Sequence, residues 1–344
     1  MAIEIIATGR AVPARRVTND ELATRLDTSD EWIRSHTGIG SRHIADPDVA
    51  ASDLATEAAN AALAALVGRD PSPGLSVEAA AMTLDLIVVA TATADYIGFP
   101  STACLVQDRI GAKRAAAMDV TAGCTGFIYG LDAAAGILTM GKERRRALVI
   151  GAEVLTHIAD WSDRSTCVLF GDAAGAAIIE KTDAPSEGPG KCGLLRSVLG
   201  ADGSGSEHLI IRKGGTRHPF QKGETVERPP CLEMNGQAVY SFAVKAMTET
   251  IARLLAEEGV GAEDLTWIVP HQANARIVQA AARRLKIPEG KFFLNIEEYA
   301  NTSAATIPLA LDELVRSGRI ARGDLVLTVA FGAGLTYGGN LILW

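Results

Sequence analysis

The sequence predicts an α/β protein made of two similar halves, in which helices cover both faces of mixed or parallel sheets. Three observations indicate this fold class. Strand and helix patterns alternate along the 344 residues, as they do where helices cover a sheet. The length corresponds to about two average domains. The order of elements in the first half recurs in the second, which indicates an internal duplication.

The first half begins with a strand and alternates from there. Short apolar or β-branched runs predict strands, and periodic apolar positions predict helices. The expected strands cover residues 1–10, 84–93, 115–120 and 147–154. The expected helices start near Ser29, cover about 52–66 and 101–110, and run from just after Cys124 to Gly141.

The second half repeats this order after a segment rich in Pro, Gly and Ser. That segment, Thr182 to Gly193, is the expected boundary, so the predicted units are residues 1–182 and 183–344. The expected helices cover about 237–258, 274–285 and 303–317, and the expected strands 265–270, 292–296 and 324–331.

An overlay of the two halves brings particular residues into correspondence. Leu86 matches Trp267, and Ala147 matches Leu325 at nearly the same offset. The same overlay pairs Cys124 with Asn301, each where a strand is expected to turn into a helix. We therefore expect these two side chains at equivalent points of two α/β units.

Composition excludes several classes of protein. Apolar residues make up 48% and charged residues 22%, which is typical of a globular chain. The longest apolar stretch, Ala79 to Ala94, is short and contains Asp85, which argues against a membrane span. A net charge of −8 argues against nucleic acid as a partner.

The cysteines and the amino terminus predict a cytoplasmic protein. Residues 1–10 read as a strand and not as a signal peptide. Five cysteines stand far apart without a CxxC pair, which favours a reducing compartment and argues against a disulfide framework or a zinc site. We expect no bound metal.

Nucleotide-binding and hydrolase motifs fail on inspection. Gly136 to Lys142 resembles a phosphate-binding loop, but Glu143 stands where Ser or Thr is required, and the segment ends a helix. Neither a GxGxxG dinucleotide fingerprint, a GxSxG elbow nor an HExxH motif occurs.

One candidate nucleophile is Cys124 in DVTAGCTGF, residues 119–127. The segment places small residues between a strand and a helix, so the sulfur would lie at a helix amino terminus. The partial positive charge there favours the thiolate and is expected to lower the thiol pKa. The alternative is a buried cysteine that serves as a small apolar residue.

Two further segments offer polar groups at strand ends. His271 in VPHQANARI can donate a hydrogen bond to an oxyanion or exchange a proton near neutral pH. Asn301 in YANTSAAT offers an uncharged donor. For both segments the alternative is helix capping, by Gln272 and Asn274 or by Asn301 and its neighbours. A thiolate and two neutral donors together suit acyl transfer followed by enolate formation.

These three segments resemble the active-site signatures of the thiolase superfamily, and more narrowly those of β-ketoacyl-[acyl-carrier-protein] synthase III. TSDEWIRSHTGI, FPSTAC, SDRSTCVLFGDAAGA and FGAGLTYGG also fit that family, so the resemblance covers nearly the whole chain. It implies a duplicated, layered αβαβα thiolase-like fold. It also implies an acyltransferase that starts fatty-acid synthesis by a decarboxylating condensation of an acyl-CoA primer with malonyl-acyl-carrier protein, without a cofactor.

The resemblance also implies roles for individual residues. Cys124 would carry the acyl group, and His271 and Asn301 would stabilise the enolate. Backbone N–H groups of Cys124 and Ala333 would bind the other oxyanion. Phe170 and Phe331 would shape the site, and Phe99 would close the acyl pocket across the interface of a homodimer.

Coenzyme A and pantetheine contacts follow from the same resemblance. They fall on Thr28, Trp32, Gly236 and Asn274. The chain departs from the family pattern at His36 and His157, where arginines are usual, and at Gln237 beside Gly236. Because a neutral histidine lacks the guanidinium fork, these departures bear on coenzyme A affinity.

A basic helix face is the expected docking site for the acidic carrier protein. It carries Arg276, Arg283 and Arg284 after the HQAN motif. The alternative is an ordinary solvated face.

Other readings remain open. They are a secondary-metabolite condensing enzyme or acyltransferase of the same fold, a thioesterase, and a non-catalytic partner subunit, against which the presence of Cys124 argues. The sequence does not give the primer, nor whether Lys213 to Cys231 forms a lid or a plain loop.

Overall fold

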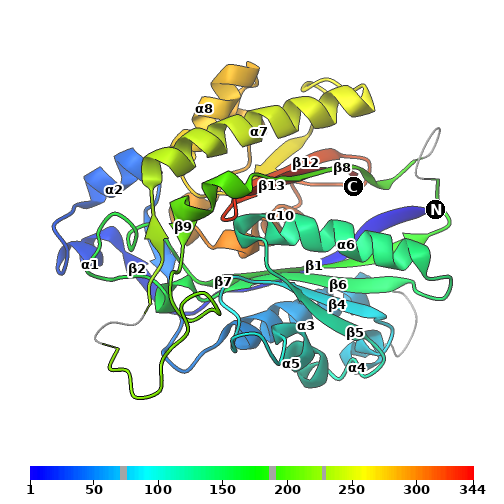
Figure 1. Cartoon of the computed structure of the whole chain (residues 1–344). Helices are drawn as coiled ribbons and strands as arrows, with labels where there is room; N and C mark the ends of the chain where they lie inside the picture. Colours follow the sequence, from blue (N-terminus) through cyan, green and yellow to red (C-terminus); the bar gives the residue numbers. More distant parts are fainter. Residues whose placement is uncertain (70–75, 186–190, 227–229) are drawn as a thin grey trace.

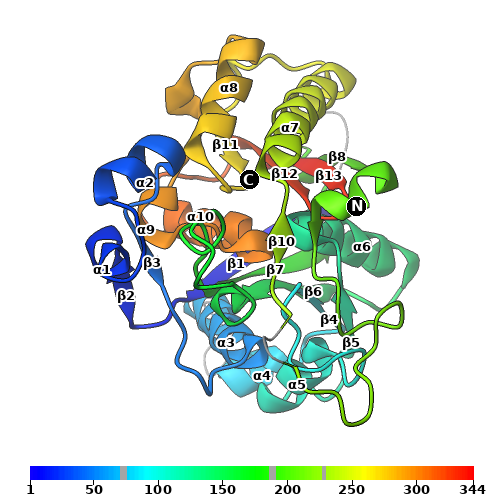
Figure 2. The same ribbon diagram turned by 60° about the vertical axis from the view of Figure 1, so that its left-hand side comes forward.

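A computed structural model describes residues 1–69, 76–185, 191–226 and 230–344. Five layers alternate between helices and sheets, with one helical layer between two sheets and one outside each of them (Figure 1). The view turned by 60° separates the outer helical layers on opposite sides of the molecule (Figure 2). This is the layered, duplicated α/β fold that the sequence predicts.

The first sheet contains the strands of the amino-terminal half. Its order is β1-β7-β6-β4-β5, in which β4 is parallel to β5 and β6, and β7 runs antiparallel to both β1 and β6. The strands are β1 (Ala2–Ala11), β4 (Leu86–Ala90), β5 (Ala116–Val120), β6 (Arg146–Glu153) and β7 (Ala173–Thr182). The outer face is covered by α3 (Ala51–Arg69), α4 (Val77–Ala81) and α5 (Thr102–Arg109), whose alanines allow close packing.

The second sheet repeats this plan in the carboxyl-terminal half. Its order is β11-β12-β13-β8, with β11 parallel to β12 and the other pairs antiparallel. The strands are β8 (Gly193–Ala201), β11 (Trp267–Pro270), β12 (Leu325–Gly332) and β13 (Thr336–Leu343). Two helices, α7 (Gly236–Glu258) and α8 (Ala275–Leu285), cover its outer face.

The middle layer consists of α6 (Gly126–Met140) and α10 (Thr306–Arg316). Apolar residues of both helices pack in one buried cluster with both sheets, which joins the halves. A short 3₁₀ turn precedes each helix: η1 (Gly123–Thr125) before α6 and η5 (Ser303–Ala305) before α10. The two turns pack against each other, and an added Cβ at Gly126 would lie 3.5 Å from the Ala304 side chain.

Strand register supports the correspondence between the halves. Leu86 of β4 pairs with Ala147 of β6, and Trp267 of β11 pairs with Val326 of β12. The overlay made from the sequence matched Ala147 with Leu325. Strand pairing matches it with Val326, so the overlay was wrong by one residue. The strands of the first sheet end at Thr182 and those of the second begin at Gly193; the division of the chain at residue 182 stays a prediction.

The strand expected at 292–296 is wrong. Only one bridge forms there, between Phe292 and Ile268, at the sheet edge that corresponds to β5. The chain then turns away because the Asn295 N–H donates to the Gln272 side chain at 2.8 Å. Asn301 consequently follows the short helix α9 (Ile296–Tyr299) and not a strand.

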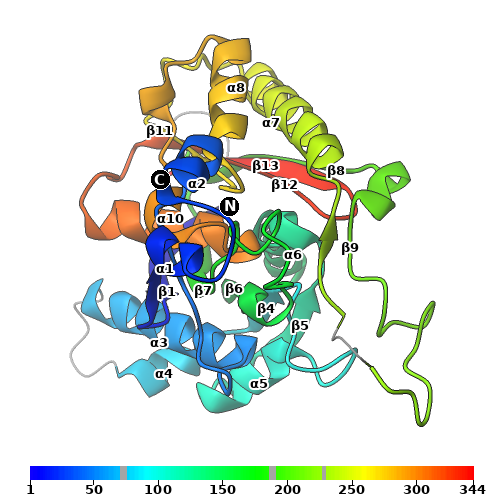
Figure 3. The same cartoon turned by 90° about the vertical axis from the view of Figure 1, so that its left-hand side faces the viewer.

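Smaller elements complete the described chain. They are β2 (Arg16–Thr18), α1 (Asn19–Ala23), α2 (Asp30–Thr37), β3 (Ser41–His43), η2 (Leu155–His157), η3 (Gly203–His208), β9 (Leu209–Ile210), β10 (Glu233–Met234) and η4 (Glu289–Lys291). The segment after β9 projects away from the layers (Figure 3). It belongs to the loop Lys213 to Cys231, of which residues 227–229 lie outside the described residues. No described helix is long and apolar enough to span a membrane.

Candidate active site

A cavity of about 240 Å³ collects the predicted site residues from both halves. Cys124 comes from the first half, and His271 and Asn301 come from the second. Two of the predicted pocket phenylalanines, Phe170 and Phe331, also line it. Its lining is mostly apolar, with Leu169, Leu209, Met234, Val239, Ala273 and Ile277 among the remaining residues.

Cys124 is held at the start of α6 by two glycines. Gly123 has a positive φ of 52°, and a Cβ there would lie 2.9 Å from the Ala333 nitrogen. A Cβ at Gly332 would lie 2.6 Å from the Cys124 nitrogen. The absence of side chains at these two positions therefore lets the backbone at Ala333 approach the backbone of Cys124.

The expected low pKa of the Cys124 thiol is wrong. Burial raises the pKa of this thiol to about 12, and the nearby Glu153 carboxyl adds to the effect. Hydrogen bonds from the Ser303 hydroxyl and the Cys124 backbone act in the opposite direction. The helix terminus is present as predicted, but the cost of a desolvated thiolate exceeds its contribution.

His271 begins the segment after β11. Its backbone N–H donates to the Val329 carbonyl of β12 at 2.7 Å. Its ring packs edge-on against the Phe331 ring, with 5.2 Å between the ring centroids. Burial lowers the pKa of His271 to about 3. The expectation of proton exchange near neutral pH is therefore wrong for the protein without substrate, and the imidazole is neutral.

The Thr306 hydroxyl decides which ring nitrogen of His271 carries the proton. His271 Nδ1 lies 2.7 Å from Thr306 Oγ1, and that hydroxyl donates to the Ser303 carbonyl. While the hydroxyl donates to the carbonyl, Nδ1 must carry the ring proton and Nε2 is an acceptor. If the hydroxyl turns to donate to Nδ1, Nε2 carries the proton and can donate to an oxyanion.

The Asn301 amide is oriented by its own turn. Its Oδ1 accepts the Ser303 N–H at 2.9 Å, so its Nδ2 is left as the donor for the cavity. Its backbone is fixed by a bridge to Phe170, with the Asn301 N–H donating to the Leu169 carbonyl at 2.9 Å. Asn301 is thus a positioned donor that also caps the following turn.

Three of the four predicted coenzyme contacts line the cavity. They are Trp32, Gly236 and Asn274, and Asn274 also donates to the His36 carbonyl at 3.0 Å. Thr28 is not among the lining residues, although its buried hydroxyl has no hydrogen-bond partner within the described part of the chain. His36 lines the cavity and stacks on Trp32 at 4.4 Å.

Other predicted residues lie away from the cavity. His157 lines a separate pocket with Arg15, Arg25 and Trp161. Phe99 is 87% exposed and is absent from the lining of the cavity in its own chain. The three arginines predicted to dock the carrier protein are exposed on α8, and Arg283 lies 3.9 Å from Glu289.

Sequence reasoning missed three polar residues behind the site, namely Glu153, Ser303 and Thr306. Glu153 ends an apolar strand and is fully buried, and Ser303 donates to it at 2.9 Å. A lone carboxyl at the end of a run such as ALVIGAEV could have indicated this position, because buried carboxyl groups require partners.

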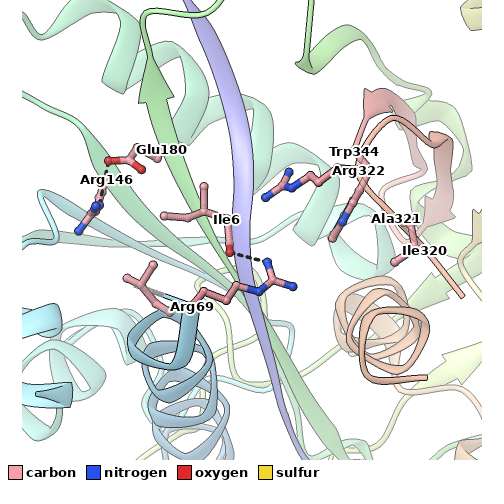
Figure 4. A pocket seen from close by; sticks show the side chains of 9 residues that line it. Ile6, Arg69, Arg146, Glu180, Ile320, Ala321, Arg322 and Trp344 are labelled. Carbon is pink, nitrogen blue, oxygen red and sulfur yellow. Dashed lines mark hydrogen bonds and ion pairs between the residues drawn. The ribbon is translucent and has the colours of Figure 1, made fainter. Parts of the chain in front are cut away.

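A larger, more open pocket lies elsewhere. Arg69, Arg146 and Arg322 line it together with Glu180 and Trp344 (Figure 4). Arg146 pairs with Glu180 at 3.0 Å, and Arg69 and Arg322 donate to the backbone carbonyls of Ile6 and Ile5. This pocket shares no lining residue with the cavity at Cys124.

Comparison with known proteins identifies the family. Residues 118–203 match the family model for 3-oxoacyl-[acyl-carrier-protein] synthase III, and residues 255–344 match the model for its carboxyl-terminal part. The chain is 47% identical to β-ketoacyl-[acyl-carrier-protein] synthase III of Caldanaerobacter subterraneus subsp. tengcongensis, over all of this chain and 98% of the relative. The chain belongs to the β-ketoacyl-[acyl-carrier-protein] synthase III family.

Solved structures agree with this membership. The synthase III of Aquifex aeolicus VF5 has a TM-score of 0.86 and 40% identity, with both chains fully covered. The priming β-ketosynthase of the R1128 polyketide pathway has a TM-score of 0.86 and 34% identity, covering 99% of this chain and 96% of that one. The predicted thiolase-like fold and the predicted class, a condensing acyltransferase of the synthase III type, are confirmed.

Proposed function

We propose that the cavity performs the condensation that starts fatty-acid synthesis, with Cys124 as the residue that carries the acyl group. The observation that supports this assignment is the convergence of Cys124, His271 and Asn301 in one apolar cavity from three separate segments. The substrates are an acyl-CoA and malonyl-acyl-carrier protein, and the residues supply the chemistry without a metal or cofactor.

In the first half-reaction, the Cys124 thiolate attacks the thioester carbonyl of the acyl-CoA. The negative charge that forms on the carbonyl oxygen is stabilised by the N–H groups of Cys124 and Ala333. The close approach of these two backbones, which Gly123 and Gly332 allow, supports this role. Coenzyme A leaves as its thiolate and takes up a proton.

In the second half-reaction, the malonyl group loses CO2 and its thioester oxygen becomes an enolate oxygen. Asn301 Nδ2 donates to that oxygen. His271 Nε2 donates to it as well once the Thr306 hydroxyl turns from the Ser303 carbonyl to donate to Nδ1, which leaves the ring proton on Nε2. The carbanion then attacks the acyl-cysteine and releases Cys124. A neutral imidazole suits this step because it stabilises the enolate without protonating the carbon.

Several finer assignments belong to the same proposal. Trp32, Gly236 and Asn274 bind the coenzyme or pantetheine arm, and Phe170 and Phe331 shape the acyl end. The enzyme acts in the cytoplasm as a homodimer, in which Phe99 reaches the partner's pocket. Phe99 is 87% exposed in the single chain, and so large an exposed apolar side chain supports a position that the partner covers. The face with Arg276, Arg283 and Arg284 docks the carrier protein.

Intact-mass spectrometry after incubation with a panel of acyl-CoAs tests the proposal. The expected result is a single acyl adduct on Cys124, absent in Cys124→Ala, which malonyl-acyl-carrier protein converts into a 3-oxoacyl product. Release of free acid alone would indicate a thioesterase, and the absence of an adduct would indicate a non-catalytic subunit. A loaded enzyme that does not use malonyl-acyl-carrier protein would favour an acyltransferase of secondary metabolism.

A further inference from the structure

Glu153 is a fully buried carboxyl group directly behind the candidate nucleophile. It ends β6, and its relative exposure is 0%. Its polar contacts all come from donors. They are the Ala92 N–H at 3.1 Å, the hydroxyls of Thr93 at 2.7 Å, Ser303 at 2.9 Å and Thr91 at 3.4 Å, and the Ala304 N–H. Such a set of donors fits an ionised carboxylate, although burial opposes ionisation and raises the pKa of Glu153 to about 7.

Ser303 connects this carboxyl group to Cys124. Its hydroxyl donates to Glu153 Oε1 at 2.9 Å and also hydrogen-bonds the Cys124 side chain, an interaction that lowers the pKa of the thiol. Ser303 is held in a left-handed conformation, with φ of 48°, in the turn that packs against the turn of Cys124. Because the hydroxyl has one proton and two lone pairs, it can accept from the sulfur while it donates to the carboxylate.

We propose that Glu153, acting through Ser303, is a positioning residue that sets the protonation state of Cys124. The S–H bond of Cys124 breaks as its proton passes to Ser303 Oγ, and the proton that Ser303 held forms an O–H bond on Glu153. The negative charge moves from the carboxylate to the sulfur, whose electron pair attacks the thioester. When the coenzyme thiolate departs, it takes up the proton that returns along the same path, so the exchange is balanced.

The electrostatics of the cavity favour this transfer over loss of the thiol proton to water. Moving the proton from Cys124 to Glu153 leaves one negative charge in the buried site before and after. Loss of the thiol proton to solvent would place a second negative charge beside Glu153, which explains why this carboxyl raises the pKa of the thiol.

The neighbouring titratable groups leave this pairing intact. His271 is neutral, and its Nδ1 is engaged by Thr306. Asp172 precedes Ala173, the β7 residue that pairs with Glu153. It accepts hydrogen bonds from the Ala45 N–H and the Thr156 hydroxyl; burial raises its pKa, and the charge of His157 acts in the opposite direction. Besides burial, the Ser303 and Glu153 side chains shift the pKa of the Cys124 thiol, in opposite directions.

The proposal rests on the proposed function only in taking Cys124 as the acyl acceptor, so its test uses a reagent other than acyl-CoA. The rate of Cys124 alkylation by iodoacetamide is measured from pH 5.5 to 9.5, with peptide mass spectrometry to separate Cys124 from the other cysteines. Wild type is expected to show a rise centred near pH 7, where the pair loses its first proton, followed by a plateau. Glu153→Gln and Ser303→Ala should both lose that rise and react about tenfold or more slowly at pH 7.5.

Asp172→Asn is the matched control, since it removes another buried carboxylate without touching Ser303. It is expected to keep the rise near pH 7. Variants that lower the rate at every pH but leave the rise in place would overturn the proposal, because Glu153 would then have a purely structural role. Faster alkylation of Glu153→Gln would also overturn it, since the carboxylate would then act only as an opposing charge.

Acyl-CoA loading of the same variants separates the two claims. If no acyl adduct forms on wild type but the alkylation profile behaves as expected, the proposed function fails and the pairing of Cys124 with Glu153 stands. If loading succeeds and the alkylation profile does not depend on Glu153 and Ser303, the proposed function stands and the pairing fails.

Discussion

His271 Nδ1 lies 2.7 Å from the Thr306 hydroxyl, so a residue at the start of α10 sets the tautomer of the imidazole. We predict that Thr306→Val lowers malonyl decarboxylation about tenfold, because the imidazole loses the hydroxyl that, once turned from the Ser303 carbonyl to Nδ1, leaves the ring proton on Nε2. Acyl loading should change less. Radiolabelled CO2 release and intact-mass loading assays measure the two steps.

Thr250→Val is the control for this substitution. Thr250 is also buried, and its hydroxyl has no hydrogen-bond partner among the described residues, so its removal should leave both half-reactions unchanged. Equal losses of loading and decarboxylation in Thr306→Val would point to general damage to the site and contradict the prediction.

Gly332→Ala is expected to impair acyl loading about a hundredfold. The added Cβ would lie 2.6 Å from the Cys124 nitrogen and would push apart the two backbones proposed to bind the oxyanion. Stopped-flow loading with acyl-CoA measures the effect. Gly136→Ala is the matched control, since its Cβ meets nothing within 4 Å inside α6, and it should load normally. Normal loading by Gly332→Ala would argue against this assignment.

Arg276→Glu should raise the KM for malonyl-acyl-carrier protein about tenfold, because the acidic partner would meet a negative charge beside the cavity. Loading with acyl-CoA should remain unchanged. Arg114→Glu, an exposed arginine in the turn after α5, provides the same charge change away from α8. Equal KM increases in both variants would mean that the change in net charge alone causes the effect, and would count against a docking face on α8.

The dependence of folding stability on pH should reveal two opposing groups. The pKa of His271 falls from 6.5 to about 3 on folding, so the unfolded chain binds the extra proton between these values and stability falls as pH drops. The pKa of Glu153 rises from 4.5 to about 7, so the folded chain binds the extra proton between these values and stability falls as pH rises. Between pH 4.5 and 6.5 the two effects oppose each other.

Glu153→Gln should remove one side of this balance. As the pH is lowered from 6.5 to 4.5, the free energy of unfolding of this variant should fall relative to that of wild type by up to about 1.4 kcal/mol per pH unit. Urea denaturation at several pH values measures the slope. Cys124→Ala should keep the wild-type slope, because the thiol does not titrate in this range. Parallel slopes for Glu153→Gln and wild type would refute the balance.

The fold and the main site residues could be predicted because they depend on local patterns. The duplicated order of elements follows from apolar periodicity, and small residues around Cys124 indicate a turn that opens a helix. The edge strand at 292–296 could not be excluded in the same way. Its pattern is strand-like, and the hydrogen bond from the Asn295 N–H to the Gln272 side chain joins residues that meet only in the folded chain.

The pKa values could not be predicted from the sequence for a related reason. The helix terminus at Cys124 is visible in the sequence, but the burial that outweighs it depends on packing between the two halves. Glu153 and Ser303 are 150 residues apart and meet only in the folded protein. Their contact is a product of tertiary structure, so no single segment could have indicated it.

The middle layer shared by α6 and α10 makes catalysis sensitive to the alignment of the duplicated units. The Cys124 sulfur belongs to one unit, and the Asn301 amide and the His271 imidazole belong to the other. A small rotation between the units would separate these groups while leaving each unit's own hydrogen bonding unaltered. Activity can thus be lost before the secondary structure unfolds, and a loss of turnover is the earlier sign that the packing between the two units has weakened.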